Sequence, residues 1–141
     1  GIEASVETMP KAVYFKRASR GGPNKSPEFS FMLLGWGAGS GEASSPLKAL
    51  LHTYDKSKGL GAANRGRHSD AEVDKLVKQA LATVDADARG ALLAKATEKA
   101  VGENYGVIPM HYQVNTWAAK AGYKYLPRTD ERTIVTGLSN N

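Results

Sequence analysis

The chain has 141 residues, a net charge of +5 at pH 7 and no cysteine, so it has the length of one domain and cannot hold a disulfide, a thiolate zinc site or a cysteine nucleophile. Apolar residues make up 41% of it, but 20 of these are Ala, which leaves a thin set of core-forming side chains for this length. No apolar run approaches the roughly 20 residues of a membrane helix, and the modest charge together with periodic segments argues against disorder.

The first 34 residues predict a strand, a helix and a second strand. Residues 2–6 alternate apolar and polar side chains, which is typical of a strand with one buried face. Pro10 suits the first position of a short helix that ends near Ala18. After a loop rich in Gly and Pro, the apolar run at residues 29–34 predicts a strand covered on both faces. A strand, a helix and a strand in this order form a βαβ unit, so we expect a parallel sheet and an α/β fold.

Residues 35–45 combine four glycines with Ser, Glu and one Trp. They show no periodicity, so they predict a loop at the carboxyl end of a buried strand, where open α/β sheets bind ligands. A phosphate-binding loop is the weaker alternative, because neither GxGxxG nor a following Gly-Lys-Ser/Thr is present. Ser45 and Pro46 then suit the N-cap and first position of a short amphipathic helix that reaches Tyr54.

The next part of the chain predicts a helical hairpin. Ser69 and Glu72 match a capping box, and apolar residues follow at helical spacing. A second helix over residues 87–101, capped near Asp85, carries its own apolar stripe.

The last third predicts extended structure. Residues 107–119 alternate in side-chain character and predict a long strand segment. Weaker strand signals follow at residues 122–125 and 133–135. Trp36 and Trp117 lie in polar sequence, where each could form an aromatic wall for a ligand or cover an Ala-rich core.

Enzyme chemistry has little support. His52, His68 and His111 lie on three different predicted elements without a metal-binding spacing, and no nucleophile elbow is present. The excess of basic residues leaves one alternative open, a stand-alone module that binds an acidic macromolecule through residues 11–25 and 65–67. Nucleic acid is not the expected partner, because no aromatic residues are interleaved with residues 64–67.

Four motifs occur in order and cover almost the whole chain: residues 1–10, which begin GIE and end ETMP; 29–37, which end LLGWG; 64–76, NRGRHSDAEVDKL; and 108–112, IPMHY. Together they resemble the C-terminal lobe of family 5 extracytoplasmic solute-binding proteins, the peptide/nickel-type binding components of bacterial ABC importers.

This resemblance implies a periplasmic or lipid-anchored receptor of two lobes, with a periplasmic binding protein type 2-like fold. Such a receptor closes around a small solute such as a peptide and delivers it to the permease subunits in the membrane. Residues 1–141 would then be a single domain, part of the C-terminal lobe, containing the βαβ unit, the helical hairpin and the long strand segment. The resemblance implies no catalysis, cofactor or metal.

The resemblance also places the ligand cleft. In relatives that bind peptides, the loop after the Gly-Trp pair carries an Asp that pairs with the amino group of the ligand. Gly39 stands at the matching position, so a simple dipeptide specificity is not expected, while Glu42 offers a carboxylate in another geometry. The ligand-binding residues implied in this way are Trp36, Gly37, Ala38, Gly39, Ser40, Glu42, Asn64 and Arg65.

A partial lobe leaves surfaces that missing strands would cover. We therefore expect exposed apolar side chains along residues 2–6 or 107–116, which self-association could hide.

Overall fold

The computed structural model describes residues 1–140 and combines helices with one small antiparallel sheet. The α-helices are α1 (Lys11–Arg20), α2 (Ser44–Pro46), α3 (Ala71–Ala82) and α4 (Ala86–Thr97). The π-helical turns η2 (Leu47–Leu51) and η3 (Glu98–Glu103) continue α2 and α4, and η1 (Pro23–Lys25) and η4 (Val135–Gly137) are 3₁₀ turns. The strands are β1 (Tyr123–Tyr125) and β2 (Leu138–Asn140). None of the helices in this part of the chain has the length and apolar character needed to cross a membrane.

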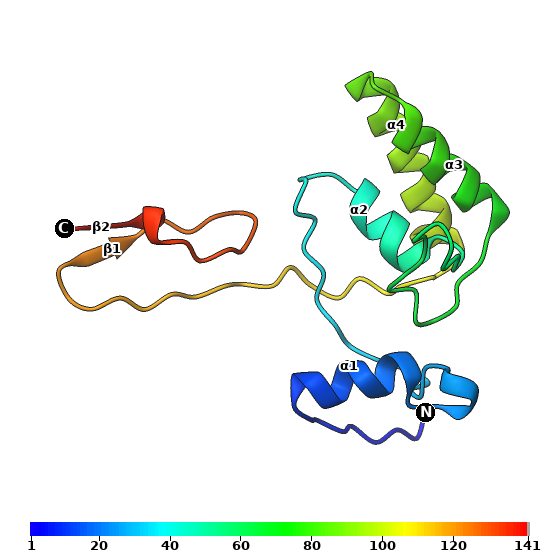
Figure 1. Ribbon diagram of the computed structural model, residues 1–141, viewed down its shortest axis with the longest axis horizontal. Helices are drawn as coiled ribbons and strands as arrows, with labels where there is room; N and C mark the ends of the chain where they lie inside the picture. Colours follow the sequence, from blue (N-terminus) through cyan, green and yellow to red (C-terminus); the bar gives the residue numbers. More distant parts are fainter. Residues whose placement is uncertain (141) are drawn as a thin grey trace.

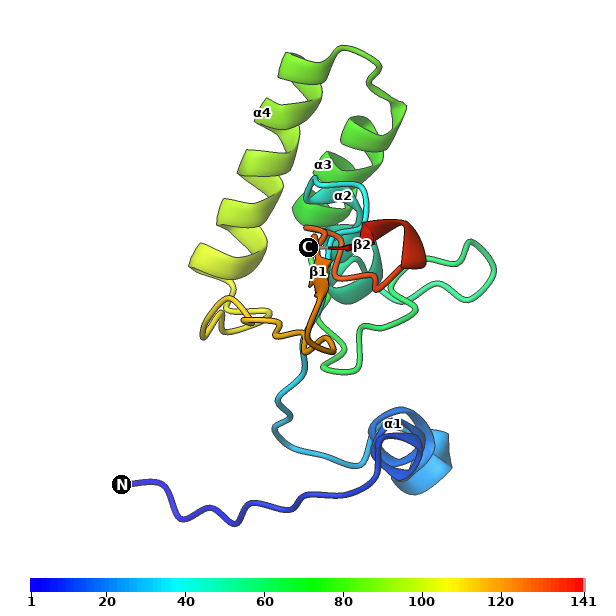
Figure 2. The same cartoon turned by 90° about the vertical axis from the view of Figure 1, so that its left-hand side faces the viewer.

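The chain forms three parts joined by extended segments (Figures 1 and 2). α1 and its flanking segments form the first part. The helices α2, α3 and α4 form the second, in which α3 and α4 run antiparallel as the predicted hairpin. A long extended run leads from η3 to the third part, the β1–β2 hairpin.

α3 begins at Ala71 because Asp70 caps it. The Oδ1 atom of Asp70 accepts hydrogen bonds from the backbone N–H groups of Glu72 at 2.8 Å and Val73 at 2.9 Å. The prediction that Ser69 is the capping residue is wrong by one position, because its hydroxyl instead pairs with the Thr53 hydroxyl at 2.8 Å.

The predicted cap of α4 is confirmed: the Oδ1 atom of Asp85 accepts from the N–H of Ala88 at 2.8 Å. The helix continues as η3 to Glu103, and the N–H of Gly106 then donates to the carbonyl of Ala100 at 2.8 Å.

The helix after the glycine-rich loop begins two residues earlier than predicted, at Ser44 rather than Pro46. Ala43 precedes its first residue, Ser44, and no side chain caps it, so the predicted N-cap role of Ser45 is wrong. The helix also ends earlier than the predicted Tyr54: η2 ends at Leu51, because His52 adopts an extended backbone with ψ of 142°.

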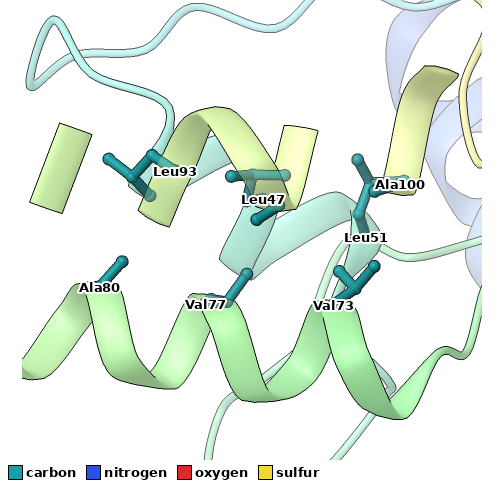
Figure 3. Close-up of a cluster of buried hydrophobic side chains, with 8 residues drawn as sticks. Leu47, Leu51, Val73, Val77, Ala80, Leu93 and Ala100 are labelled. Atoms are coloured by element: carbon teal, nitrogen blue, oxygen red, sulfur yellow. The ribbon is translucent and has the colours of Figure 1, made fainter. Parts of the chain in front are cut away.

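The core lies where this short helix meets the hairpin. Leu47 and Leu51 extend from η2 into the space between α3 and α4 (Figure 3). Val73 and Val77 are its largest fully buried side chains, and Ala80, Ala96 and Ala100 let the helix backbones approach closely. The buried cluster consists of Leu47, Leu51, Val73, Val77, Ala80, Leu93, Ala96 and Ala100.

The strands predicted at residues 2–6, 29–34 and 107–119 do not form, and the βαβ unit and its parallel sheet are therefore wrong for this chain. Residues in these segments have no neighbouring strand within residues 1–140, and an extended segment needs a partner to satisfy its backbone. A side chain holds one of the segments, and an ion pair holds the residue that directly follows another. The Tyr14 hydroxyl donates to the Leu33 carbonyl at 2.8 Å, and the guanidinium of Arg17 pairs with Glu7 at 3.0 Å.

The expected exposure of apolar side chains is confirmed along both segments named for it. Ile2 is 95% exposed and Tyr112 is 99% exposed. Apolar side chains therefore face solvent along two long stretches of backbone.

Only the first of the two weak strand signals near the C-terminus is confirmed. β1 lies within residues 122–125 as expected, whereas residues 133–135 form no strand. The partner of β1 is Leu138–Asn140, with Tyr125 opposite Leu138. Residues 135–137 form the 3₁₀ turn, in which Gly137 is needed because an added Cβ would lie 2.9 Å from the ring of Tyr125.

We predict that Leu47→Ala destabilises the chain by about 3 kcal/mol, since it removes a side chain that is 2% exposed and leaves a cavity. Thermal denaturation followed by circular dichroism at 222 nm measures this. The matched control, Leu81→Ala, removes a side chain that is 48% exposed and should change stability by much less. Equal losses in the two variants would contradict the position of the core.

We also predict a pH-dependent effect of Asp70→Ala. The backbone N–H of Val73, aided by the side chain of Asn104, holds the pKa of Asp70 below its ordinary value. The cap therefore stabilises the fold above about pH 4 and stops doing so as the pH falls through the lowered pKa. The variant should melt below the parent at pH 7, and the difference should vanish in strong acid. Asp87→Ala, in the first turn of α4, is the control that should show a smaller difference at pH 7.

Candidate functional site

The base of the predicted cleft loop lies against the C-terminal part of the chain. An added Cβ on Gly35 would lie 3.1 Å from Oε1 of Gln113, and one on Gly37 would lie 3.7 Å from Oε2 of Glu131. Trp36, between these two contacts, is 44% exposed. The loop thus presents one aromatic face to solvent beside the extended run.

The tip of the loop is an exposed turn. The N–H of Gly41 donates to the carbonyl of Ala38 at 2.8 Å, and Gly41 has a φ of +75°, a left-handed conformation that favours glycine. No atom lies within 4 Å of an added Cβ on Gly39, and Ser40 is exposed. This backbone is open to an approaching ligand.

Glu42 is anchored within the chain. Its Oε1 accepts from the Ser44 hydroxyl at 2.6 Å, and its Oε2 accepts from Nε of Arg89 on α4 at 3.0 Å. The Ser44 hydroxyl is the main reason that the pKa of Glu42 is lowered. Both carboxylate oxygens are thus engaged, and their main effect here is to fix the end of the loop to the helical hairpin.

Asn64 is 3% exposed and closes the loop between η2 and α3. Its Nδ2 donates to the carbonyls of His52 at 3.0 Å and His68 at 2.7 Å, while its Oδ1 accepts from the N–H of His68 at 3.0 Å. One carboxamide therefore joins the two ends of residues 52–68.

Arg65 connects this loop to α1. Its Nε donates to the Ser19 hydroxyl at 3.1 Å, and its guanidinium lies 5.1 Å from the centre of the Phe15 ring, a cation–π contact. Arg67 makes a similar contact with Tyr54 at 4.6 Å.

His52 is buried and His68 is half-buried beside Asn64. His52 places Nδ1 at 2.8 Å from the carbonyl of Thr53 and 3.2 Å from Oδ1 of Asp74, and His68 places Nδ1 at 2.7 Å from the carbonyl of Leu51. The Nε2 atom of each ring is buried and has no hydrogen-bond partner in the part of the chain that the structure describes. No group of three potential metal ligands forms within residues 1–140, and His111 lies apart in the exposed run.

The structure brings the eight predicted ligand residues together only in part. Trp36, Gly37, Ala38, Gly39 and Ser40 form one exposed loop, Glu42 pairs with α4, and Asn64 and Arg65 belong to the separate loop between η2 and α3. The last two contribute their polar groups to internal contacts.

A hollow of about 410 Å³ lies on the C-terminal hairpin, and none of these eight residues lines it. It is lined by Trp117, Ala118, Ala119, Lys120, Tyr123, Tyr125, Thr133 and Leu138. Sequence analysis noted Trp117 as a candidate ligand wall but did not include this site. The alternation of Tyr123 and Tyr125, which puts both rings on one face of a strand, was the available signal.

Comparisons with family models, with curated proteins and with solved structures gave no match for this chain.

We predict that Asn64→Ala destabilises the chain by roughly 3 kcal/mol, since two buried carbonyls and one N–H lose their partner together. Limited proteolysis should detect faster cleavage within residues 52–68. Asn140→Ala, at an exposed position of β2, is the matched control and should leave the cleavage rate unchanged. Parent-like cleavage in Asn64→Ala would contradict the role of this carboxamide.

Proposed function

We propose that the chain is part of the C-terminal lobe of a solute-binding protein that serves an ABC importer and binds a peptide or related small solute. The four ordered motifs at residues 1–10, 29–37, 64–76 and 108–112 support the family and its periplasmic location. We propose that this lobe has a periplasmic binding protein type 2-like fold, of which these residues form one part.

The main support for the proposal is that three extended segments leave apolar side chains exposed. Residues 2–6, 29–34 and 107–116 have the apolar composition of strands, lack strand partners among the described residues 1–140 and expose several large apolar side chains. Each such side chain would gain roughly 1.5–3 kcal/mol from full burial. A sheet completed by further strands of a larger lobe would supply that burial.

The loop at residues 36–40 supplies the proposed contact with the solute. Trp36 offers an aromatic face, and the glycine backbone of the tip permits close approach of a ligand. In the proposed mechanism a second lobe closes over this loop, and the free energy of binding favours the closed state.

Binding to an acidic macromolecule is the alternative function, and the contacts of the basic residues weaken it. Glu7 and Glu28 pair with Arg17, while Arg65 and Arg67 lie over aromatic rings. The exposed cations that remain near α1 are Lys11, Lys16, Arg20 and Lys25. Salt-dependent retention on a polyanion column separates this alternative from solute binding.

In the native polypeptide that contains this chain, Trp36→Ala should weaken binding of a peptide pool by about ten-fold, or about 1.4 kcal/mol, because the aromatic contact is lost. Isothermal titration calorimetry measures the affinity. Val84→Ala, at an exposed position between α3 and α4, is the control and should bind as the parent does.

Two results would contradict the proposal. One is unchanged peptide affinity in Trp36→Ala. The other is a native polypeptide whose intact mass matches these residues alone, since the proposed receptor needs a second lobe.

A further inference from the structure

We propose that the hollow on the C-terminal hairpin is a binding site for a small aromatic carboxylate. None of the residues that line it belongs to the loop at residues 36–40, so the inference does not depend on the proposed function. Its volume of about 410 Å³ falls within the range of small-molecule sites.

The aromatic walls of the hollow are fixed in place. Nε1 of Trp117 donates to the Thr133 hydroxyl at 2.9 Å. The hydroxyl of Tyr125 donates to the carbonyl of Arg132 at 3.2 Å and accepts from the N–H of Ile134 at 3.1 Å. Because both rings are held by their polar ends, the apolar faces are ordered before a ligand arrives.

The two rings form a corner rather than a closed stack. The centres of Trp117 and Tyr125 are 5.6 Å apart, and their planes are inclined by 36°. Tyr123 lies on the same side of β1, and Leu138 is opposite Tyr125 in the strand register. A flat ring entering this corner can contact one aromatic face and one edge at once, the arrangement that aromatic pairs prefer.

The charge at the hollow selects an anion. Lys120 is the charged residue among those that line it, it is exposed, and none of the ion pairs formed within residues 1–140 includes it. The nearby Arg128 is paired with Asp130, whose pKa this hydrogen bond lowers to about 2. An aromatic carboxylate can pack its ring against the walls and pair its charge with the ammonium group of Lys120. An aromatic amine would instead place a like charge beside Lys120.

The test uses the full chain with Trp36→Phe, which leaves Trp117 as the single tryptophan. Its fluorescence is followed during titration with 3-phenylpropionate, with 3-phenylpropylamine and with 3-cyclohexylpropionate. We expect saturable binding of 3-phenylpropionate, at least five-fold tighter than either analogue.

Lys120→Gln should remove the preference for the carboxylate over the amine, and the matched variant Lys124→Gln, one residue from Tyr123 on the other side of the strand, should keep it. No saturable change up to about 10 mM 3-phenylpropionate, or equal affinity for the three compounds, would overturn the inference. Equal effects of the two lysine variants would also overturn the inference.

The two proposals fail independently. Because Trp36 is replaced in this titration, a negative result leaves the proposed peptide site untouched, and a negative result for Trp36→Ala leaves the aromatic carboxylate site untouched.

Discussion

The burial of Leu47 and Leu51 between α3 and α4 is the interaction on which the rest of the structure depends. Two loops flank this short helix: the glycine-rich loop precedes it, and residues 52–68 follow it. On one side, Glu42 pairs with Arg89 and fixes the end of the glycine-rich loop to the hairpin. On the other, the carboxamide of Asn64 closes the loop that returns to α3. These hydrogen bonds therefore lie directly beside the apolar cluster. The core is small because Ala80, Ala96 and Ala100 fill three of its helix positions.

Outside this core the chain is held mainly by polar contacts. Arg17 joins Glu7 and Glu28 around α1, and Arg65 connects α1 to the loop of Asn64. Exposed ion pairs of this kind contribute about 0–1 kcal/mol each, much less than a buried leucine. This contrast explains how the helical body can be well packed while long apolar stretches before and after it face solvent. It is also the physical basis for proposing a larger lobe.

Local signals predicted the helical hairpin. The Asp85 cap, the apolar stripe of α3 and the strand signal at residues 122–125 act within a few residues, and the structure follows them. Strand pairing depends on distant chain, so the alternation at residues 2–6 and the apolar run at 29–34 predicted strands that have no partner here. For the candidate site, sequence identified the exposed Trp36 loop. The sequence could not show that the Asn64 side chain points inward. That orientation depends on its hydrogen bonds to the carbonyls of His52 and His68, which only the fold brings together.

Amide hydrogen exchange tests the central claim most directly, when it is measured on this chain alone and on the native polypeptide that contains it. We expect the amides of α3 and α4 to be protected in both. We also expect residues 2–6, 29–34 and 107–116 to exchange freely in the isolated chain and to become protected in the native polypeptide, where further strands of the proposed lobe pair with them. Free exchange of those three segments in the native polypeptide would contradict the proposed larger lobe.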